Sequence, residues 1–358
     1  MADGTHILIV GTGAVGAFYG SRLHDPANSV FVSLVCRSNY AAVKKRGVYL
    51  RTRDYGEYHF RPHAVYPSIQ AAADSGQTWN YAVVTTKCLP DITDDSAEIV
   101  PIVSDETHIV LIQNGIGLEE PHRRRFPQNP ILSCVTIVSA AQVEPGVIIQ
   151  HRWTRVSIGP YGVGQRGGDD VHQLESRGQA STSEFVKMLT HGGVKDAEEY
   201  DEKGLQLVRW HKLCINASMN PSAVLSGGAG NSTMSLDTEL RIHLKACMDE
   251  IFVAAPKVLG RSFPEHLATP DKILRSTERN TNAKPSMLLD WESNRPMEIE
   301  VILGNPVRIA RAHGVDMPRL QALYALLKMA QQRRDQANAL MGGKRAADNT
   351  ALEVESKL

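Results

Sequence analysis

The sequence predicts an α/β protein in which a doubly wound, mostly parallel sheet is followed by an all-α C-terminal domain. In the first half, short runs rich in Val and Ile alternate with helical segments, as in parallel sheets covered on both faces. From about residue 201 the apolar residues repeat only at helical spacing. Because 358 residues suffice for two domains, we expect them at 1–200 and 201–340, with a flexible tail at 341–358.

The elements of the first half follow in a regular order. The stretch THILIVGTGAVGAFYGSRLH (5–24) predicts a buried strand, a glycine turn and a helix. The remaining elements are expected to be a strand at 29–37, a short helix at 41–47, a strand at 80–87, a crossover helix at 91–103, a strand at 107–115, strands within 131–162 joined by a Pro-Gly turn, a helix at 183–193 and an edge strand at 194–200. Residues 162–182 are rich in Gly, Gln and charge, which predicts a mobile surface loop.

The second half contains four segments with helical periodicity and no internal repeat. They cover residues 205–220, 240–260, 296–314 and 318–334. We therefore expect a helical domain after residue 201.

Composition excludes several classes of protein. Lys+Arg and Asp+Glu both number 39, so there is no basic excess of the kind nucleic-acid-binding proteins carry. No apolar run is long enough to span a bilayer, and we expect no membrane partner. The five cysteines are scattered without a CxxC pair, which suits reduced thiols and predicts no metal site. The oligomeric state stays open between monomer and homodimer.

The sequence finishes with Ser356-Lys357-Leu358, a tripeptide of the kind that peroxisomal import receptors read. The preceding segment is polar and rich in Gly and Ala, so the tripeptide should be accessible to such a receptor. We expect a peroxisomal location, with the cytoplasm as the alternative.

The glycine turn predicts a dinucleotide site. Gly11, Gly13 and Gly16 form G-x-G-x-x-G directly after the first strand, the arrangement of a Rossmann-type domain. Glycine there allows a tight turn and close approach to a pyrophosphate, which the helix N-terminus then binds. The alternative is a turn with a structural role only. Candidate cofactor-binding residues in the turn are Gly11, Thr12, Gly13, Ala14, Val15 and Gly16.

Three further residues at strand ends are cofactor candidates. Arg37 follows the second strand with no acidic residue beside it in sequence, which favours the 2′-phosphate of NADPH over the ribose hydroxyl of NADH. Lys87 and Asn114 follow later strands, at the sheet edge where doubly wound folds bind ligands. A cap or turn role is the alternative for both residues.

A row of polar residues marks the start of the second half. If residues 205–220 form one helix, Lys212, Asn216 and Asn220 lie within about 80° of one another, with apolar residues on both sides. A helix that is apolar on both sides is buried, so its polar row needs partners. The row is interpreted as an active-site lining, the alternative being a hydrogen-bond network between helices.

Together these motifs resemble those of ketopantoate reductases. The resemblance extends from about residue 5 to 330 and rests on the glycine turn, Arg37, Lys87, QNG (113–115), WHKLCINASMNP (210–221), SMLLDW (286–291) and MEIEVILG (297–304). It implies a two-domain enzyme that uses NADPH to reduce 2-dehydropantoate to pantoate, a step towards pantothenate and coenzyme A.

The resemblance also assigns roles. It implies that Lys212 is the general acid and that Asn216, Asn220, Ser286 and Glu298 bind the 2-oxo acid substrate. A lysine desolvated between apolar helices gives up its proton readily, as protonation of an alkoxide requires. Ser286 has an alternative role at the start of a helix.

Two other functions remain open at this point. The segment at 162–182 and the tail depart from the family pattern, which leaves room for a paralogous reductase of another 2-oxo acid or an imine. A non-catalytic NADPH-binding sensor would be expected to lack Lys212 or Glu298, and both are present.

Overall fold

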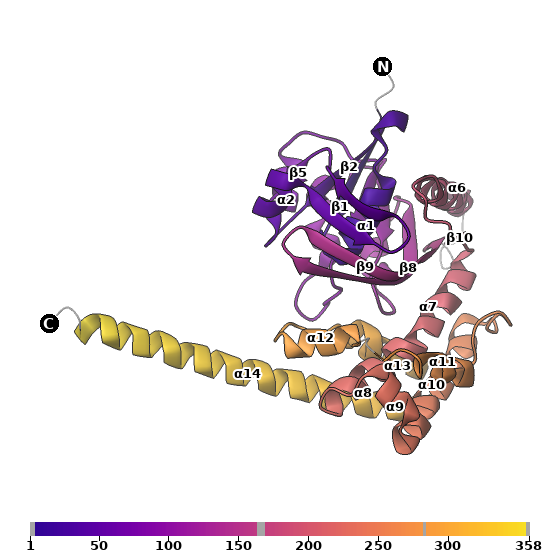
Figure 1. The fold of residues 1–358 in the computed structure, drawn as a ribbon. Helices are drawn as coiled ribbons and strands as arrows, with labels where there is room; N and C mark the ends of the chain where they lie inside the picture. Colours follow the sequence, from indigo (N-terminus) through magenta and orange to yellow (C-terminus); the bar gives the residue numbers. More distant parts are fainter. Residues whose placement is uncertain (1–3, 163–168, 282–283, 356–358) are drawn as a thin grey trace. The chain divides into compact units, whose positions relative to one another are not determined.

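The computed structural model describes residues 4–162, 169–281 and 284–355, with the backbone alone for 169–173 and 341–355. The chain forms two compact units (Figure 1). The first comprises residues 1–212 with 259–263, and the second comprises residues 213–258 with 264–358. The division therefore falls inside helix α7 (Glu202–Asn216), whereas the sequence placed it just before that helix.

The first unit is built on one sheet, whose strands lie in the order β4-β3-β9-β8-β7-β6-β1-β2-β5, with β10 paired to β9. The strands are β1 (Thr5–Val10), β2 (Val30–Val35), β3 (Val48–Thr52), β4 (Gly56–Phe60), β5 (Val65–Tyr66), β6 (Tyr81–Val84), β7 (His108–Leu111), β8 (Ile131–Glu144), β9 (Val147–Pro160) and β10 (Ala197–Glu199). The central strands run parallel, and β8–β9 and β3–β4 are antiparallel pairs. The predicted Rossmann-like sheet is confirmed, although the sequence patterns missed β3, β4 and β5.

Six α-helices belong to the described part of this unit besides α7. They are α1 (Ala14–Leu23), α2 (Tyr40–Arg46), α3 (Ile69–Ala73), α4 (Asp95–Glu98), α5 (Glu119–Arg125) and α6 (Asp169–His191). The crossover helix expected at 91–103 is reduced to α4 and a 3₁₀ turn, η2 (Val100–Ile102). Pro101 explains the interruption, because proline lacks the N–H that continues a helix.

The predicted loop at 162–182 is wrong from residue 169 onward, because α6 begins there. Residues 163–168 lie outside the described residues. Gly178, one of the residues that suggested a loop, is part of α6; a Cβ at this position would lie 3.1 Å from Pro160. The apolar residues Phe185 and Leu189 of the same helix are fully buried, so packing against the sheet outweighs the weak helix propensity of the glycine.

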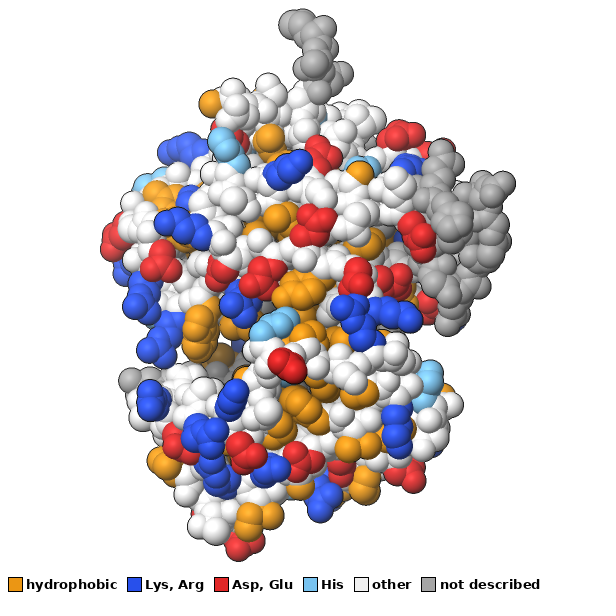
Figure 2. Space-filling model, turned by 90° about the vertical axis from the view of Figure 1, so that its right-hand side faces the viewer, with side chains coloured by type: hydrophobic (Ala, Val, Ile, Leu, Met, Phe, Trp, Pro, Cys, Tyr) orange, Lys and Arg blue, Asp and Glu red, His pale blue; other side chains and the backbone are white. Residues whose placement is uncertain are grey.

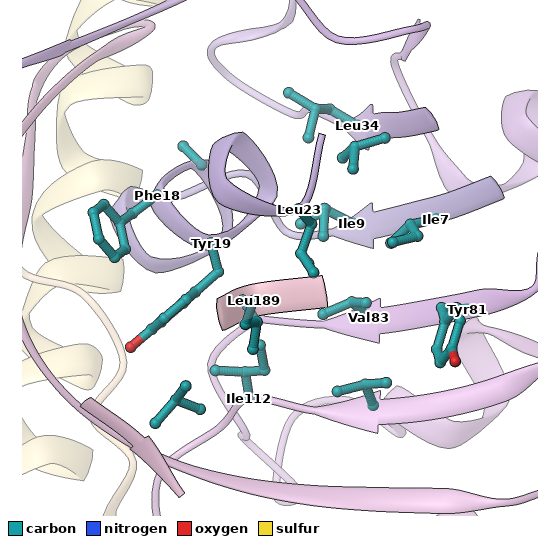
Figure 3. Close-up of a cluster of buried hydrophobic side chains, with 14 of the residues drawn as sticks. Ile7, Ile9, Phe18, Tyr19, Leu23, Leu34, Tyr81, Val83, Ile112 and Leu189 are labelled. Atoms are coloured by element: carbon teal, nitrogen blue, oxygen red, sulfur yellow. The ribbon is translucent and has the colours of Figure 1, made fainter. Parts of the chain in front are cut away.

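The core of the first unit lies between α1 and the parallel strands (Figure 3). Ile7 and Ile9 of β1 and Val83 of β6 are buried in this cluster, as are Phe18 and Leu23 of α1. Central strands that are apolar throughout are typical of a sheet buried on both faces. This packing fixes the start of α1 at the end of β1, where the glycine turn lies.

The described residues of the second unit contain only helices, as predicted. They are α8 (Met219–Leu225), α9 (Asn231–Leu236), α10 (Thr238–Leu259), α11 (Pro270–Thr277), α12 (Ser286–Glu292), the π-helix η3 (Glu300–Gly304), α13 (Asn305–Ala312) and α14 (Pro318–Glu355). Helix α14 continues through the expected tail as far as Glu355. The tripeptide at 356–358 lies outside the described residues.

Two surface features complete the fold. None of the described helices combines the length and the hydropathy needed to cross a membrane. On the face shown in Figure 2, basic and acidic side chains are interspersed, in keeping with the zero net charge.

Candidate functional site

The carboxyl ends of four parallel strands meet at one edge of the sheet. Val10 of β1 pairs in register with Val35 of β2 and Val84 of β6, and Val84 pairs with Leu111 of β7. The loops that follow these strands therefore leave the same edge. They carry the glycine turn, Arg37, Lys87 and Asn114, the residues that the sequence assigned to the cofactor.

The three glycines of the turn differ in whether the fold itself requires glycine at their position. Gly11 has φ +96°, a backbone conformation that disfavours other residues, and an added Cβ would lie 2.8 Å from the Thr86 nitrogen. At Gly16 an added Cβ would lie 2.4 Å from Thr85 Oγ1, so glycine allows α1 to pack closely on the sheet. Gly13 has φ −84°, and an added Cβ would meet no atom within 4 Å.

Only Gly13 is therefore unexplained by the fold. The space beside it is open at the N-terminus of α1, where the first backbone N–H groups of a helix lack intrahelical partners. An anionic group that approaches the backbone closely would account for a glycine there. The turn fits the pyrophosphate of a dinucleotide.

Arg37 has an acidic partner that its sequence neighbours did not indicate. Its guanidinium lies 3.3 Å from the carboxylate of Glu98, the last residue of α4. The Arg37 side chain remains 71% exposed, so an exposed ion pair of this kind is worth at most about 1 kcal/mol. A phosphate could readily replace the carboxylate.

Lys212 and Asn114 are brought together by the fold. Lys212 Nζ donates a hydrogen bond to Asn114 Oδ1 at 2.7 Å, and both side chains are half-buried. Lys87 is exposed, three residues beyond the end of β6.

Hydrogen bonds join the loop that carries Asn114 to the loop after β6, and that loop to the glycine turn. Thr85 Oγ1 donates to the Gly11 carbonyl at 2.5 Å, and Gln113 Nε2 donates to the Thr86 carbonyl at 3.0 Å. Asn114 follows Gln113 directly. The candidate general acid therefore lies at the same sheet edge as the candidate cofactor turn, which the sequence predicted only in outline.

The polar row does not lie on a single helix, and that part of the prediction is wrong. Helix α7 ends at Asn216, and α8 begins at Met219 after a short turn. The break follows from Pro221, which has no N–H to donate to the carbonyl four residues earlier. The apolar residues on both sides of Lys212 are mostly buried, as expected.

The two asparagines of the row differ in burial. Asn216 is half-buried, whereas Asn220 is only 3% exposed and its Nδ2 has no hydrogen-bond partner among the described residues. Asn231, the first residue of α9, similarly buries an unpartnered Oδ1. Helices α8 and α9 pack together, and unpaired buried amide atoms are costly unless a ligand satisfies them. The sequence patterns missed Asn231, because a lone asparagine in a Gly-rich loop carries no signal.

Ser286 and Glu298 lie in the second unit. Ser286 is exposed and is the first residue of α12. It therefore begins a helix, which is the alternative role that the sequence left open. Glu298 is buried, two residues before η3. Glu300, the first residue of the π-helix η3, is also buried.

Glu300 is occupied by structural partners. Its carboxylate accepts hydrogen bonds from Arg308 at 2.7 Å, Tyr324 at 2.7 Å and Lys328 at 2.9 Å. Burial raises the pKa of Glu300, but these hydrogen bonds outweigh it and hold the pKa below its usual value. Glu300 is thus engaged by these three side chains, and the substrate contact that the family resemblance assigns to Glu298 stays a prediction.

Sequence patterns also missed a buried ion pair beside the loop that carries Asn114. Arg209, on α7, is 3% exposed, and its Nε lies 3.1 Å from a carboxylate oxygen of Glu119, which is 1% exposed. Arg209 Nη1 donates to the main-chain carbonyls of Gln113 and Gly115, on either side of Asn114. Among the described residues, no group of three or more His, Cys, Asp and Glu side chains is arranged to hold a metal ion.

Comparison with known proteins identifies the family. The sequence profile described as ketopantoate reductase PanE/ApbA matches residues 7–162, and that of its C-terminal domain matches residues 204–331. The chain belongs to the ketopantoate reductase family. It is thus related to oxidoreductases, and the family resemblance stated from the sequence is confirmed.

The relatives of this ketopantoate reductase family member include both an uncharacterized protein and a named reductase. An uncharacterized protein of Saccharomyces cerevisiae is 31% identical, covering 94% of this chain and 96% of the relative. A 2-dehydropantoate 2-reductase of Nostoc is 27% identical, covering 89% of this chain and 93% of the relative.

Solved structures share the family fold. The 2-dehydropantoate 2-reductase of Methylococcus capsulatus superimposes with a TM-score of 0.76 at 31% identity, covering 92% of this chain and 97% of that protein. D-mandelate dehydrogenase, solved with NADH and anilino(oxo)acetate, has a TM-score of 0.72 at 18% identity, over 92% of this chain and 100% of that protein. At that identity the likeness concerns the fold alone.

Proposed function

We propose that this ketopantoate reductase family member reduces a 2-oxo acid with NADPH, and that 2-dehydropantoate is the substrate. The observation that carries the proposal is the hydrogen bond from Lys212 Nζ to Asn114 Oδ1 at the sheet edge that bears the glycine turn. The similarity to 2-dehydropantoate 2-reductases over nearly the whole chain supports the substrate.

Residues of the first unit would hold the cofactor. The open space beside Gly13 suits the pyrophosphate, which the N-terminus of α1 would bind. Arg37 would bind the 2′-phosphate of NADPH through its planar guanidinium, in exchange for its exposed contact with Glu98. When bound, NADPH supplies the hydride for the reduction.

Lys212 would serve as the proton donor. Reduction of a keto group leaves a negative charge on its oxygen, and that oxygen needs a proton and a nearby positive charge. The Lys212 ammonium supplies both. Because Asn114 accepts one of its hydrogen bonds, the amine is held in a fixed direction and not left on a freely rotating chain.

Four polar side chains would contribute the substrate contacts. The carboxylate and hydroxyl groups of 2-dehydropantoate require donors and acceptors, which amide, hydroxyl and carboxylate side chains can supply. The proposed contacts are Asn216, Asn220, Ser286 and Glu298. Asn220 offers the strongest case, because its buried Nδ2 has no partner among the described residues.

A comparison of two lysine variants tests the function. The purified protein is assayed for NADPH oxidation with 2-dehydropantoate and a panel of other 2-oxo acids. Lys212→Ala should lower kcat at least about a hundredfold while NADPH affinity is kept, since general acids contribute that much. Lys203→Ala, on the exposed side of the same helix, is the matched control and should leave kcat unchanged.

The outcomes separate the candidate functions. Faster turnover of another 2-oxo acid than of 2-dehydropantoate would show that the protein is a reductase with a different substrate. NADPH binding without turnover of any compound would favour the sensor. Equal loss of activity in both lysine variants would contradict the role of Lys212 as proton donor.

A further inference from the structure

Arg209 lies one helical turn before Lys212 on α7 and is only 3% exposed. Arginine is seldom buried to this extent unless its charge is paired and its guanidinium is hydrogen-bonded. Its contacts therefore show what the buried charge holds in place.

The guanidinium of Arg209 binds both carbonyls that flank Asn114. Nη1 donates to the Gln113 carbonyl at 2.9 Å and to the Gly115 carbonyl at 3.1 Å. Gly115 has φ +97°, so the loop bends sharply at this point. The arginine thus fixes the main chain on both sides of the residue that accepts the Lys212 hydrogen bond.

The other side of the guanidinium is attached to the sheet. Nη2 donates to Ser133 Oγ at 2.6 Å and to the Cys134 carbonyl at 3.0 Å, both on β8. Glu119 neutralises the charge at 3.1 Å and also accepts hydrogen bonds from Ser133 Oγ at 2.7 Å and Gln206 Nε2 at 3.0 Å. The arginine therefore joins α7, the loop at 113–115 and β8.

Stability alone is a weak reason for this arrangement. The desolvation of a buried ion pair largely offsets its attraction, and apolar residues of the same volume often stabilise a protein as well or better. A geometric role is more consistent with where the contacts fall, since two of them bracket Asn114.

We propose that Arg209, with Glu119, is a positioning residue for the reduction. By holding the loop around Asn114 and the helix that carries Lys212, it sets the direction of the lysine amine. This inference rests on the proposed function for its kinetic readout, because Arg209 acts through Asn114 and Lys212.

Arg123 provides a matched control in the same unit. It is 7% exposed, and like Arg209 it donates to main-chain carbonyls, those of Phe126, Asn129 and Tyr161. None of these residues belongs to the 113–115 loop. Lysine in place of either arginine keeps the charge and loses the fork of donors.

The experiment compares Arg209→Lys with Arg123→Lys in the full-length protein. Both substitutions should lower the melting temperature. Only Arg209→Lys should lower kcat, by about tenfold to a hundredfold, as a small misplacement of a reacting group does. Glu119→Gln should give a smaller loss of kcat and serves if Arg209→Lys does not fold.

Equal effects of the two arginine variants on kcat, or none from Arg209→Lys and Glu119→Gln, would overturn the positioning role. If the parent protein reduces no 2-oxo acid, the proposed function fails separately. In that case, hydrogen exchange of the backbone amides at 113–115 tests whether Arg209 holds this loop in place. Faster exchange in Arg209→Lys than in Arg123→Lys would support that role, and unchanged exchange would refute it.

Discussion

The ammonium of Lys212 donates to the side-chain oxygen of Asn114 at 2.7 Å, although 98 positions separate the two residues in sequence. One lies on α7 and the other follows β7. The bond fixes the candidate proton donor to the sheet edge where the glycine turn also lies. The chemistry of the site depends on this contact.

Asn114→Asp should change the pH profile of the reaction. A carboxylate at the same distance stabilises the ammonium form of Lys212 and makes it a poorer acid. We expect kcat to fall about tenfold or more at neutral pH, with its alkaline limb moved to higher pH. The profile is measured with saturating NADPH and substrate.

Asn80→Asp is the control for this substitution, because Asn80 precedes β6, at the opposite end of that strand from the site. It should leave the pH profile unchanged. An alkaline limb that does not move in Asn114→Asp would argue against proton donation by Lys212.

Gly13→Ala and Gly16→Ala should differ in their effect on stability, and Gly13→Ala should weaken cofactor binding without destabilising the protein. At Gly13 the backbone suits alanine and a Cβ meets no atom within 4 Å, so the melting temperature should stay the same or rise slightly. NADPH affinity should nevertheless fall, by about tenfold or more, if the pyrophosphate occupies that space. At Gly16 the Cβ would lie 2.6 Å from the Gly11 carbonyl, so the melting temperature should drop.

Thermal unfolding and NADPH titration of both variants check this pair. Full NADPH affinity in Gly13→Ala would show that the cofactor does not approach that part of the turn.

Arg37→Gln should reduce the preference for NADPH. We expect KM for NADPH to rise about tenfold while KM for NADH changes little, since only NADPH carries the 2′-phosphate. Arg124→Gln is the control, because Arg124 is similarly exposed and also forms an ion pair with a glutamate. An equal rise for both cofactors in Arg37→Gln would exclude a role in recognising the 2′-phosphate.

His122 should make the protein less stable in mild acid. Burial lowers its pKa from the usual 6.5, so below that pH the unfolded chain binds more protons than the folded chain. Stability contributed by the neutral ring is therefore present above about pH 6.5 and is lost as the pH falls through that value towards the folded pKa. His122→Gln should make the melting temperature less dependent on pH between about 7.5 and 5.5.

His313→Gln is the matched control for His122. In both residues Nδ1 lies close to the carbonyl four positions earlier, at 3.0 Å for His122 and 2.9 Å for His313, but His313 is exposed. The control should keep the pH dependence of the parent. An unchanged pH dependence in His122→Gln would mean that other groups govern acid stability.

Local patterns predicted much of this protein correctly. Runs of Val and Ile gave the central strands, and the glycine spacing gave the turn between β1 and α1, because both reflect backbone rules within a few residues. The helix break before α8 was not predicted, although Pro221 marks it, because the apolar periodicity continues across it. The C-terminal part of α6 was expected as a helix at 183–193, but its N-terminal part was predicted to be a loop, because residues 162–182 are rich in Gly, Gln and charge.

The sequence by itself determined the fold class and the residue types of the candidate site. The tertiary structure decided their partners: Asn114 for Lys212, Glu98 for Arg37, and Glu119 for Arg209. These contacts join residues far apart in the chain, at distances set by sheet register and helix packing. Periodicity describes one element at a time, so it can identify a buried amine but not the side chain that receives its hydrogen bond.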